Sequence, residues 1–125
     1  MVVLDSSIII DALRLKNAAL DLIDSYSGKE TVAITIISKY EVLRGATGKD
    51  LDIALSLFRR FRILDFDDLA VDEVVKAYKR LVDKGKMVNE LDLLIAGIAA
   101  ANNETLLTRD RDFLKFESPK IIVLQ

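Results

Sequence analysis

The sequence predicts an α/β protein with a mostly parallel sheet that helices cover on both faces. Short runs of apolar β-formers, such as 2–4 and 31–36, alternate along the chain with segments whose apolar residues recur at helical spacing. Such uninterrupted apolar runs are typical of strands buried on both faces of a parallel sheet. The chain shows no internal repeat, and five Gly and one Pro leave little room for a linker, so residues 1–125 are expected to form a single domain.

The expected elements are delimited by capping residues, glycines and runs of β-formers. Val2–Leu4 is the first strand, and Ser6 or Ser7 is expected to cap a helix that runs to about Leu15. The next elements are a helical continuation over 17–27, a strand over 31–36, a helix from 38 to 45, a helix around 51–58 and a strand over 63–66. Two longer helices follow, one that Asp67 or Asp68 caps and one that Asn89 caps and that runs to 101. The last elements are a strand over 105–108, a turn with a helical piece over 109–116, and a strand over 120–124.

The composition excludes several kinds of chemistry. Cysteine and histidine are both absent, which removes disulfides, thiol nucleophiles, His-ligated zinc and a Ser-His-Asp triad. A net charge of −2 predicts neither a membrane surface nor a strong non-specific polyanion as partner, although a local basic patch stays possible. No apolar run reaches the roughly 18–20 residues of a membrane span, and Asp5 interrupts any signal-peptide pattern. We therefore expect no membrane partner and a cytoplasmic location.

Four carboxylates are expected along one edge of the sheet. Asp5 follows the first strand, Glu41 comes soon after the second, Asp110 follows the strand over 105–108, and Asp92 begins an apolar helix. The carboxyl ends of parallel strands meet at one edge, where ligands bind in open α/β sheets. Converging carboxylates raise one another's pKa unless a cation neutralises them, and an all-oxygen cluster suits Mg²⁺ or Mn²⁺.

Each of these acids also has a purely structural explanation. Glu41 is the fourth residue of a Ser-x-x-Glu capping box, and Asp92 lies in a first helical turn, where negative charge suits the helix dipole. Asp110 or Asp112 could cap the short helical piece, and Asp5 could be an ordinary turn residue. For Asp5 and Asp92, however, the neighbouring sequence is apolar, so an uncompensated carboxylate there is costly.

Taken together, these segments resemble the PIN domain and, within it, the VapC-type toxins of prokaryotic toxin–antitoxin pairs. The resemblance covers essentially the whole chain in order, and its more specific parts are the Asp-x-x-Ile-Ala helix at 92–96 and the Thr-x-Asp-x-Asp-Phe segment at 108–113. The opening strand with Asp5 and the mid-chain Glu41 agree with it. The resemblance implies a three-layer α/β/α sandwich with a mostly parallel central sheet.

The resemblance also implies a function, a divalent-metal-dependent endoribonuclease that uses Mg²⁺ or Mn²⁺ to hydrolyse RNA. Asp5, Glu41, Asp92 and Asp110 then match the catalytic and metal-binding acids, and Asp112 is a further metal-binding candidate that could share or replace the role of Asp110. The implied partners are an RNA substrate, a cognate antitoxin and a second copy of the chain in a homodimer.

Four further residues are candidates for binding the substrate. Ser6 and Thr108 match the small hydroxyl residues that line such sites in the family. Arg44 lies near Glu41 and Arg109 precedes Asp110 in sequence, so both could hold phosphates beside the acids. The alternative for the two arginines is a solvated surface charge.

Three other functions are compatible with parts of the pattern. A haloacid-dehalogenase-like phosphatase also begins with a strand ending in Asp, but Ser7 stands where that chemistry needs a second Asp. A PIN-like module that binds RNA or protein without cutting would be favoured by the loss of an acid, and all the expected acids are present. A nuclease with an RNA-processing or DNA-cleaving task is not distinguished from a toxin by these residues.

Overall fold

The computed structural model describes residues 1–87 and 89–124, and strands and helices alternate along it as the sequence predicts. Five strands form one sheet in the order β3-β2-β1-β4-β5, and every recorded pairing between neighbours is parallel. The strands are β1 (Val2–Leu4), β2 (Val32–Thr35), β3 (Arg62–Leu64), β4 (Thr105–Thr108) and β5 (Ile121–Val123). Because β1 is central, its carboxyl end lies between those of β2 and β4.

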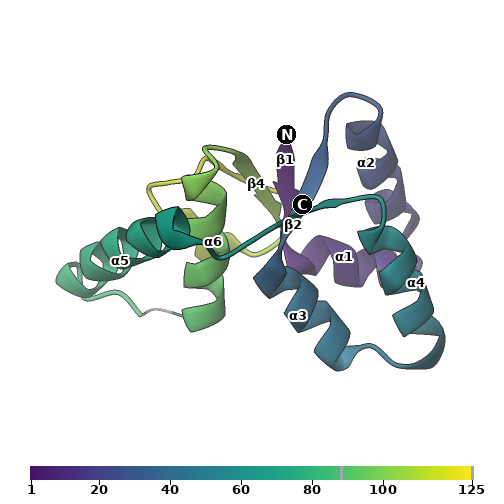
Figure 1. The fold of residues 1–125 in the computed structure, drawn as a ribbon, viewed down its shortest axis with the longest axis horizontal. Helices are drawn as coiled ribbons and strands as arrows, with labels where there is room; N and C mark the ends of the chain where they lie inside the picture. Colours follow the sequence, from purple (N-terminus) through teal and green to yellow (C-terminus); the bar gives the residue numbers. More distant parts are fainter. Residues whose placement is uncertain (88, 125) are drawn as a thin grey trace.

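Helices cover both faces of this sheet, which confirms the predicted α/β/α sandwich (Figure 1). Figure 1 shows α5 and α6 on one side of the strands and α1, α2 and α4 on the other, with α3 below the strand ends. The helices are α1 (Ser6–Leu13), α2 (Asn17–Ser27), α3 (Ile36–Gly45), α4 (Gly48–Phe58), α5 (Asp68–Asp83), α6 (Glu90–Ala101) and the 3₁₀ helix η1 (Arg111–Lys115). Among the described residues, none of these helices combines the length and apolarity needed to cross a membrane.

Alternate side chains of the strands feed two separate hydrophobic cores. Leu4 and Ile34 pack with α1, α2 and α4, whereas Val3, Ala33 and Leu106 pack with α5, α6 and η1. Successive strand residues point to opposite faces, so each strand contributes to both cores. The sheet is thus buried on both sides, as its uninterrupted apolar strands predict.

The helices α5 and α6 pack closely because α6 has small residues on the contact side. A Cβ atom added to Gly97 would collide with the Val74 side chain and lie 3.1 Å from the Val74 backbone nitrogen. Ala96 and Ala99 of the same helix are completely buried. This close packing fixes α6, and with it the first turn that holds Asp92.

Some helix ends differ from the sequence prediction. Asp5 occupies the N-cap position of α1 and Ser6 is its first helical residue, so the expectation that Ser6 or Ser7 caps this helix is wrong. The helix ends at Leu13, and Leu15 has a φ of 56°, which separates α1 from α2 where a continuous helix was expected. The predicted caps at Asp67 and Asn89 are confirmed, because each side chain accepts a hydrogen bond from the backbone nitrogen of the residue three positions later in the chain.

Candidate functional site

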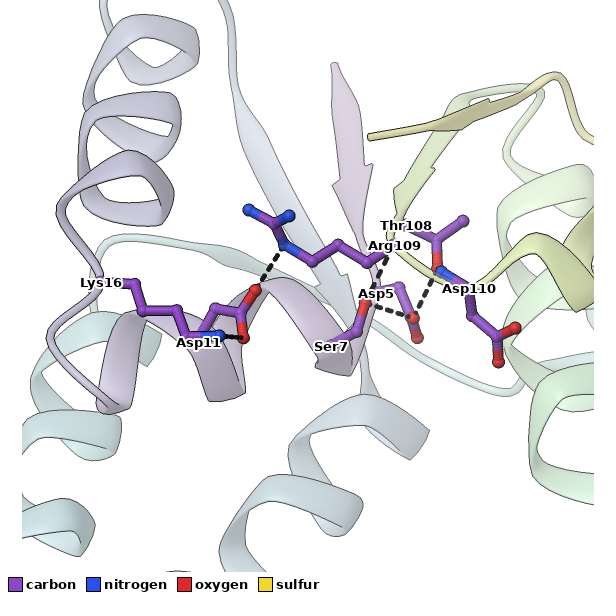
Figure 2. A network of polar contacts seen from close by, with 7 residues as sticks. All are labelled: Asp5, Ser7, Asp11, Lys16, Thr108, Arg109 and Asp110. Carbon is purple, nitrogen blue, oxygen red and sulfur yellow. Dashed lines mark hydrogen bonds and ion pairs between the residues drawn. The ribbon is translucent and has the colours of Figure 1, made fainter. Parts of the chain in front are cut away.

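Asp5 lies at the carboxyl end of β1 and is almost completely buried, with 3% of its surface exposed. Its carboxylate accepts hydrogen bonds from Ser7 Oγ at 2.9 Å and Thr108 Oγ1 at 2.8 Å, which Figure 2 shows. The hydroxyl of Ser6 is farther away, with its Oγ 3.4 Å from Asp5 Oδ1. Position at the start of α1 adds the favourable end of a helix dipole. The carboxylate is therefore both oriented and compensated by neutral donors.

Glu41 comes from α3 and reaches the same place. The cap of α3 is Thr35, whose side chain accepts a hydrogen bond from the Ser38 backbone nitrogen at 3.0 Å, so Ser38 lies inside the helix. The proposed capping box ending at Glu41 is therefore wrong. Instead, Ser6 Oγ lies 3.2 Å from Glu41 Oε1 and 3.4 Å from Asp5 Oδ1, so its one hydroxyl hydrogen is shared between the two carboxylates and links Glu41 to Asp5.

The pKa of Glu41 reflects this position. Burial raises the pKa of the Glu41 carboxyl, and the negative charge of Asp5 raises it further. The hydrogen bond from Ser6 and the positive charge of Arg44 act in the opposite direction. Arg44 is exposed and lies over the ring of Tyr40, with its guanidinium carbon 5.2 Å from the ring centroid. Arg44 thus lies near enough to Glu41 for its charge to lower the pKa of that carboxyl, and its contact with a substrate stays a prediction.

Asp92 lies in the first turn of α6, where Asn89 accepts a hydrogen bond from the Asp92 backbone nitrogen at 3.1 Å. The pKa of the Asp92 carboxyl is raised to about 6, first by burial and then by the negative charges of three other acids. In decreasing order these are Asp5, Asp110 and Glu41, and Lys115 opposes them. Four carboxylates from four separate parts of the chain thus act on one another across a shared space.

Asp110 follows β4 and caps η1, since its Oδ1 accepts a hydrogen bond from the Asp112 backbone nitrogen at 2.9 Å. The structural explanation of Asp110 is therefore correct, yet the same carboxylate also acts on Asp92. Asp110 and Asp112 are both exposed, but of the two only the charge of Asp110 is among those that raise the pKa of Asp92. This proximity to Asp92 favours Asp110 over Asp112 as the fourth acid.

The four acids do not form a closed ligand shell. Within residues 1–87 and 89–124, no group of three acidic side chains lies close enough together to hold a metal ion as it stands. Their chemistry nevertheless fits a divalent cation. All the donors are oxygens, which hard ions such as Mg²⁺ prefer, and the pKa of Asp92 is raised first by burial and then by the charges of Asp5, Asp110 and Glu41.

Of the remaining substrate-binding candidates, the two hydroxyl residues line the acids and the arginine does not. Ser6 and Thr108 are buried, and their hydroxyls orient Asp5. The Arg109 side chain turns away from the acids and pairs with Asp11 of α1 (Figure 2). A phosphate contact of Arg109 stays a prediction that this geometry does not favour.

Four residues near the site were not singled out from the sequence. Ser7 was considered only as a cap, although two hydroxyls directly after a buried acid are a recognisable signal for its hydrogen bonds. Asp11 was detectable as a single acid within an apolar helix. Tyr40 was detectable as the i, i+4 neighbour of Arg44 on the predicted helix, whereas Lys115 lacks a sequence signal, because only the fold brings it near Asp92.

A pocket of about 240 Å³ adjoins Glu41 between α1, α3 and α4. Apolar side chains and the charged side chains of Arg14 and Asp50 share its lining, which consists of Ile10, Leu13, Arg14, Glu41, Val42, Gly45, Ala46 and Asp50. This mixed lining gives the acid site a neighbouring recess for part of a ligand or partner.

Comparison with known sequences shows the family of this chain. The profile of the PIN domain matches residues 2–118, nearly the whole chain. The chain belongs to the PIN domain family. Ribonuclease VapC1 of Methanocaldococcus jannaschii is 26% identical over 111 residues, which cover 88% of this chain and 76% of that protein. The family resemblance drawn from the acidic motifs is therefore confirmed.

Solved structures share this PIN domain fold over their full length. A chain in the crystal structure of VapBC2 from Rickettsia felis bound to a promoter DNA fragment matches with a TM-score of 0.86 and 23% identity, covering 100% of both chains. A chain of VapBC-5 from Mycobacterium tuberculosis, a member of the VapBC family of toxin–antitoxin systems, matches with a TM-score of 0.73 and 25% identity over 98% of this chain and 97% of that one. These similarities confirm the PIN-like architecture.

Proposed function

We propose that this PIN domain is a divalent-metal-dependent endoribonuclease that hydrolyses RNA phosphodiesters and acts as the toxin of a VapBC-type pair. The observation that carries the proposal is the convergence of Asp5, Glu41, Asp92 and Asp110 at the carboxyl edge of the sheet. The similarity to Ribonuclease VapC1 supports RNA as the substrate. The alternative functions, DNA cleavage or binding without cleavage, lack a comparable supporting observation.

Asp5, Glu41, Asp92 and Asp110 are the residues that would hold the ion, Mg²⁺ or Mn²⁺. A divalent ion at these acids activates a water molecule and stabilises the charge that develops on the phosphate during an in-line displacement. The chain supplies the orientation: Thr108 and Ser7 fix the Asp5 carboxylate, and Ser6 couples it to Glu41. Asp5 or Asp92 orients the attacking water through a carboxylate oxygen.

The RNA backbone would be held by cations beside the acids. Arg44 lies near Glu41 and Lys115 lies near Asp92, because each positive charge lowers the pKa of the neighbouring acid. Arginine and lysine both bind phosphate oxygens, which position a substrate without selecting its sequence. The exposed ring of Tyr40 next to Arg44 offers a surface on which a base can stack.

The proposed protein partner is a cognate antitoxin, because the solved relatives are VapBC complexes. We also propose a homodimer in the cytoplasm. Helix α4 offers little apolar surface for such a contact, because Ala54, Leu57 and Phe58 are buried, although Leu55 is 40% exposed. The exposed stripe lies instead on α5, where side chains at i, i+4, i+7 and i+11 are 40–50% exposed, namely Val71, Val75, Tyr78 and Val82. Sedimentation of the wild type and of Val75→Glu checks whether this stripe is the dimer contact.

The cleavage test uses the purified chain, separated from any antitoxin, and a mixed pool of structured and single-stranded RNAs. Each reaction contains Mg²⁺, Mn²⁺ or EDTA. We expect cleavage only with a divalent ion, loss of cleavage in Asp92→Asn, and retention in Asp112→Asn, which removes a neighbouring exposed acid. Equal cleavage by wild type and Asp92→Asn would refute the proposed site.

The same reactions separate the alternative functions. Metal-dependent cleavage of a DNA pool with no cleavage of RNA would replace RNA by DNA as the substrate. Metal binding without cleavage of either pool would favour a binding module. Co-expression with a small open reading frame, if one is encoded immediately upstream, would then show whether an antitoxin-like partner copurifies.

A further inference from the structure

Asp11 is a buried carboxylate that the proposed reaction does not use. It lies on α1 with 7% of its surface exposed, about one and a half turns beyond the start of the helix. Its two oxygens bind different cations: Oδ2 pairs with Arg109 Nε, and Oδ1 pairs with Lys16 Nζ at 3.2 Å. Figure 2 shows that Arg109 extends along α1 toward Asp11, away from Asp5 and Asp110. The pair therefore joins α1 to the segment that follows β4.

The backbone of Arg109 is attached to the same helix. Its nitrogen donates to Ser7 Oγ at 3.2 Å, and Ser7 Oγ in turn donates to Asp5 Oδ2 at 2.9 Å. The residue is thus held at two points, by Ser7 through its backbone and by Asp11 through its guanidinium. Few rotations of the segment are compatible with both contacts.

The residues on either side of Arg109 each contact or provide an acid of the site. Thr108 Oγ1 donates to Asp5 Oδ2 at 2.8 Å and accepts from the Asp110 backbone nitrogen at 3.0 Å. A displacement of Arg109 would therefore move the donor that orients Asp5 and the backbone that places Asp110. Both acids depend on the position of one segment.

A buried ion pair is a costly way to gain stability, because desolvation of both charges offsets most of their attraction. It does define geometry, and a planar guanidinium is better suited to this than an ammonium group. The location of the Asp11–Arg109 pair, between α1 and the segment with two acids, gives such a geometric role a direct consequence for the site.

We propose that Asp11 and Arg109 are positioning residues that lock the 108–110 segment onto α1 and thereby align Asp5 and Asp110 for the divalent ion. This inference rests on the proposed metal-dependent function. It assigns Arg109 to the architecture of the site and not to the substrate, and it gives the buried Asp11 a task.

The test compares Asp11→Asn, Arg109→Gln and Arg109→Lys with Lys16→Gln. Lys16 also pairs with Asp11 but has a side chain that is 55% exposed and has no contact with the 108–110 segment among the described residues, so it is the matched control. We expect Asp11→Asn and Arg109→Gln to weaken Mn²⁺ binding about 10–100-fold and to lower kcat with little change in the KM for RNA. Lys16→Gln leaves all three quantities near their wild-type values, and Arg109→Lys, which keeps the charge, recovers part of the loss.

A double variant and a different outcome sharpen this test. The losses in Asp11→Asn and Arg109→Gln should not add in the combined variant, because each removes the same contact. A higher KM for RNA with unchanged Mn²⁺ affinity in Arg109→Gln would overturn the proposal, since Arg109 would then bind the substrate directly.

Hydrogen exchange gives a readout that does not depend on metal or RNA. In Asp11→Asn the backbone amides of Arg109 and Asp110 should exchange about tenfold faster or more, while the Leu106 amide, bonded to Lys120 O at 2.9 Å within the sheet, stays protected. Unchanged exchange at residues 109 and 110 overturns the positioning role. A wild type without Mn²⁺ binding would instead refute the proposed function, and the exchange result would still decide whether Asp11 positions this segment.

Discussion

The end of β1 and the start of α6 each place a carboxylate in apolar surroundings, but they compensate its charge differently. Asp5 is almost fully buried and receives hydroxyl hydrogen bonds from Ser7 and Thr108 at 2.9 and 2.8 Å. Among the described residues, none donates a hydrogen bond to the Asp92 carboxylate. Burial and the charges of three neighbouring acids raise the pKa of this carboxyl to about 6.

The difference indicates that the two acids have different roles within the site. The protein itself completes the surroundings of Asp5, which is therefore held in one orientation. Asp92 is fixed only through the packing of α6, and its pKa is raised by burial and by the neighbouring acids. The proposed divalent ion would supply the positive charge that Asp92 lacks.

The largest effect is expected from removing the compensated acid. Asp5→Asn should lower the rate of RNA cleavage by about 10³-fold or more, because a metal-ligand charge contributes several kcal/mol to stabilisation of the transition state. Single-turnover cleavage at saturating Mg²⁺ measures this loss. A rate within about tenfold of the wild type would mean that Asp5 is an ordinary strand-end residue.

Removing the donors of Asp5 should have a smaller effect on activity. Thr108→Val deletes the hydroxyl that donates to Asp5 and accepts from the Asp110 backbone. We expect metal affinity to fall by about 10–100-fold and the free energy of unfolding to fall by about 1–3 kcal/mol, because a buried carboxylate loses a partner. Thr108→Ser keeps the hydroxyl and should behave like the wild type in both measurements.

The region around Asp92 should instead respond to packing. Gly97→Ala places a Cβ against Val74 and should lower the free energy of unfolding by about 1–3 kcal/mol. In Gly45→Ala the new Cβ has no atom within 4 Å, so stability should be unchanged or higher by up to about 1 kcal/mol. Urea denaturation of the two variants compares them, and equal stabilities would show that the α5–α6 contact relaxes easily.

The smallest effect tests the sign of the charge at Asp92. The folded state raises its pKa above the ordinary 3.8, so the folded protein binds the proton more tightly than the unfolded chain does. This contribution to stability is present at low pH and is lost as pH rises from about 4 through about 6. Without metal, Asp92→Asn should therefore be more stable than the wild type by about 1 kcal/mol above this range, after allowance for solvent screening at the partly exposed group.

Thermal unfolding in EDTA across this pH range measures that difference. The stabilities of the wild type and Asp92→Asn should converge toward the acidic end. A variant less stable than the wild type at neutral pH would show that the first-turn position of Asp92 on the helix dipole matters more than repulsion from the other acids.

Much of this arrangement could be predicted from the sequence. The apolar strands, the parallel sheet and the alignment of Asp5, Glu41 and Asp110 at one edge follow from strand order and burial. The assignment of Glu41 to a capping box failed because Thr35, three residues before Ser38, offers an equally good cap at the strand end. Local motifs do not distinguish between two capping residues so close together.

Other features depend on contacts between distant parts of the chain. The pairing of Asp11 with Arg109 joins residues 98 positions apart in sequence and has no local motif. The choice of Asp110 over Asp112 depends on which carboxylate faces α6, which a two-residue spacing in a turn does not determine. The exposure of the apolar stripe on α5 is likewise not predictable from the sequence, because its apolar spacing also fits a buried helix.

The central claim is that four acids form one divalent-metal site, and a Mn²⁺ titration of the metal-free protein tests it most directly. Electron paramagnetic resonance of unbound Mn²⁺ gives the affinity for the wild type, Asp92→Asn and Asp112→Asn. We predict saturable binding by the wild type and by Asp112→Asn, and a loss of at least about tenfold in affinity for Asp92→Asn. Equal Mn²⁺ affinity in the wild type and Asp92→Asn would contradict the claim.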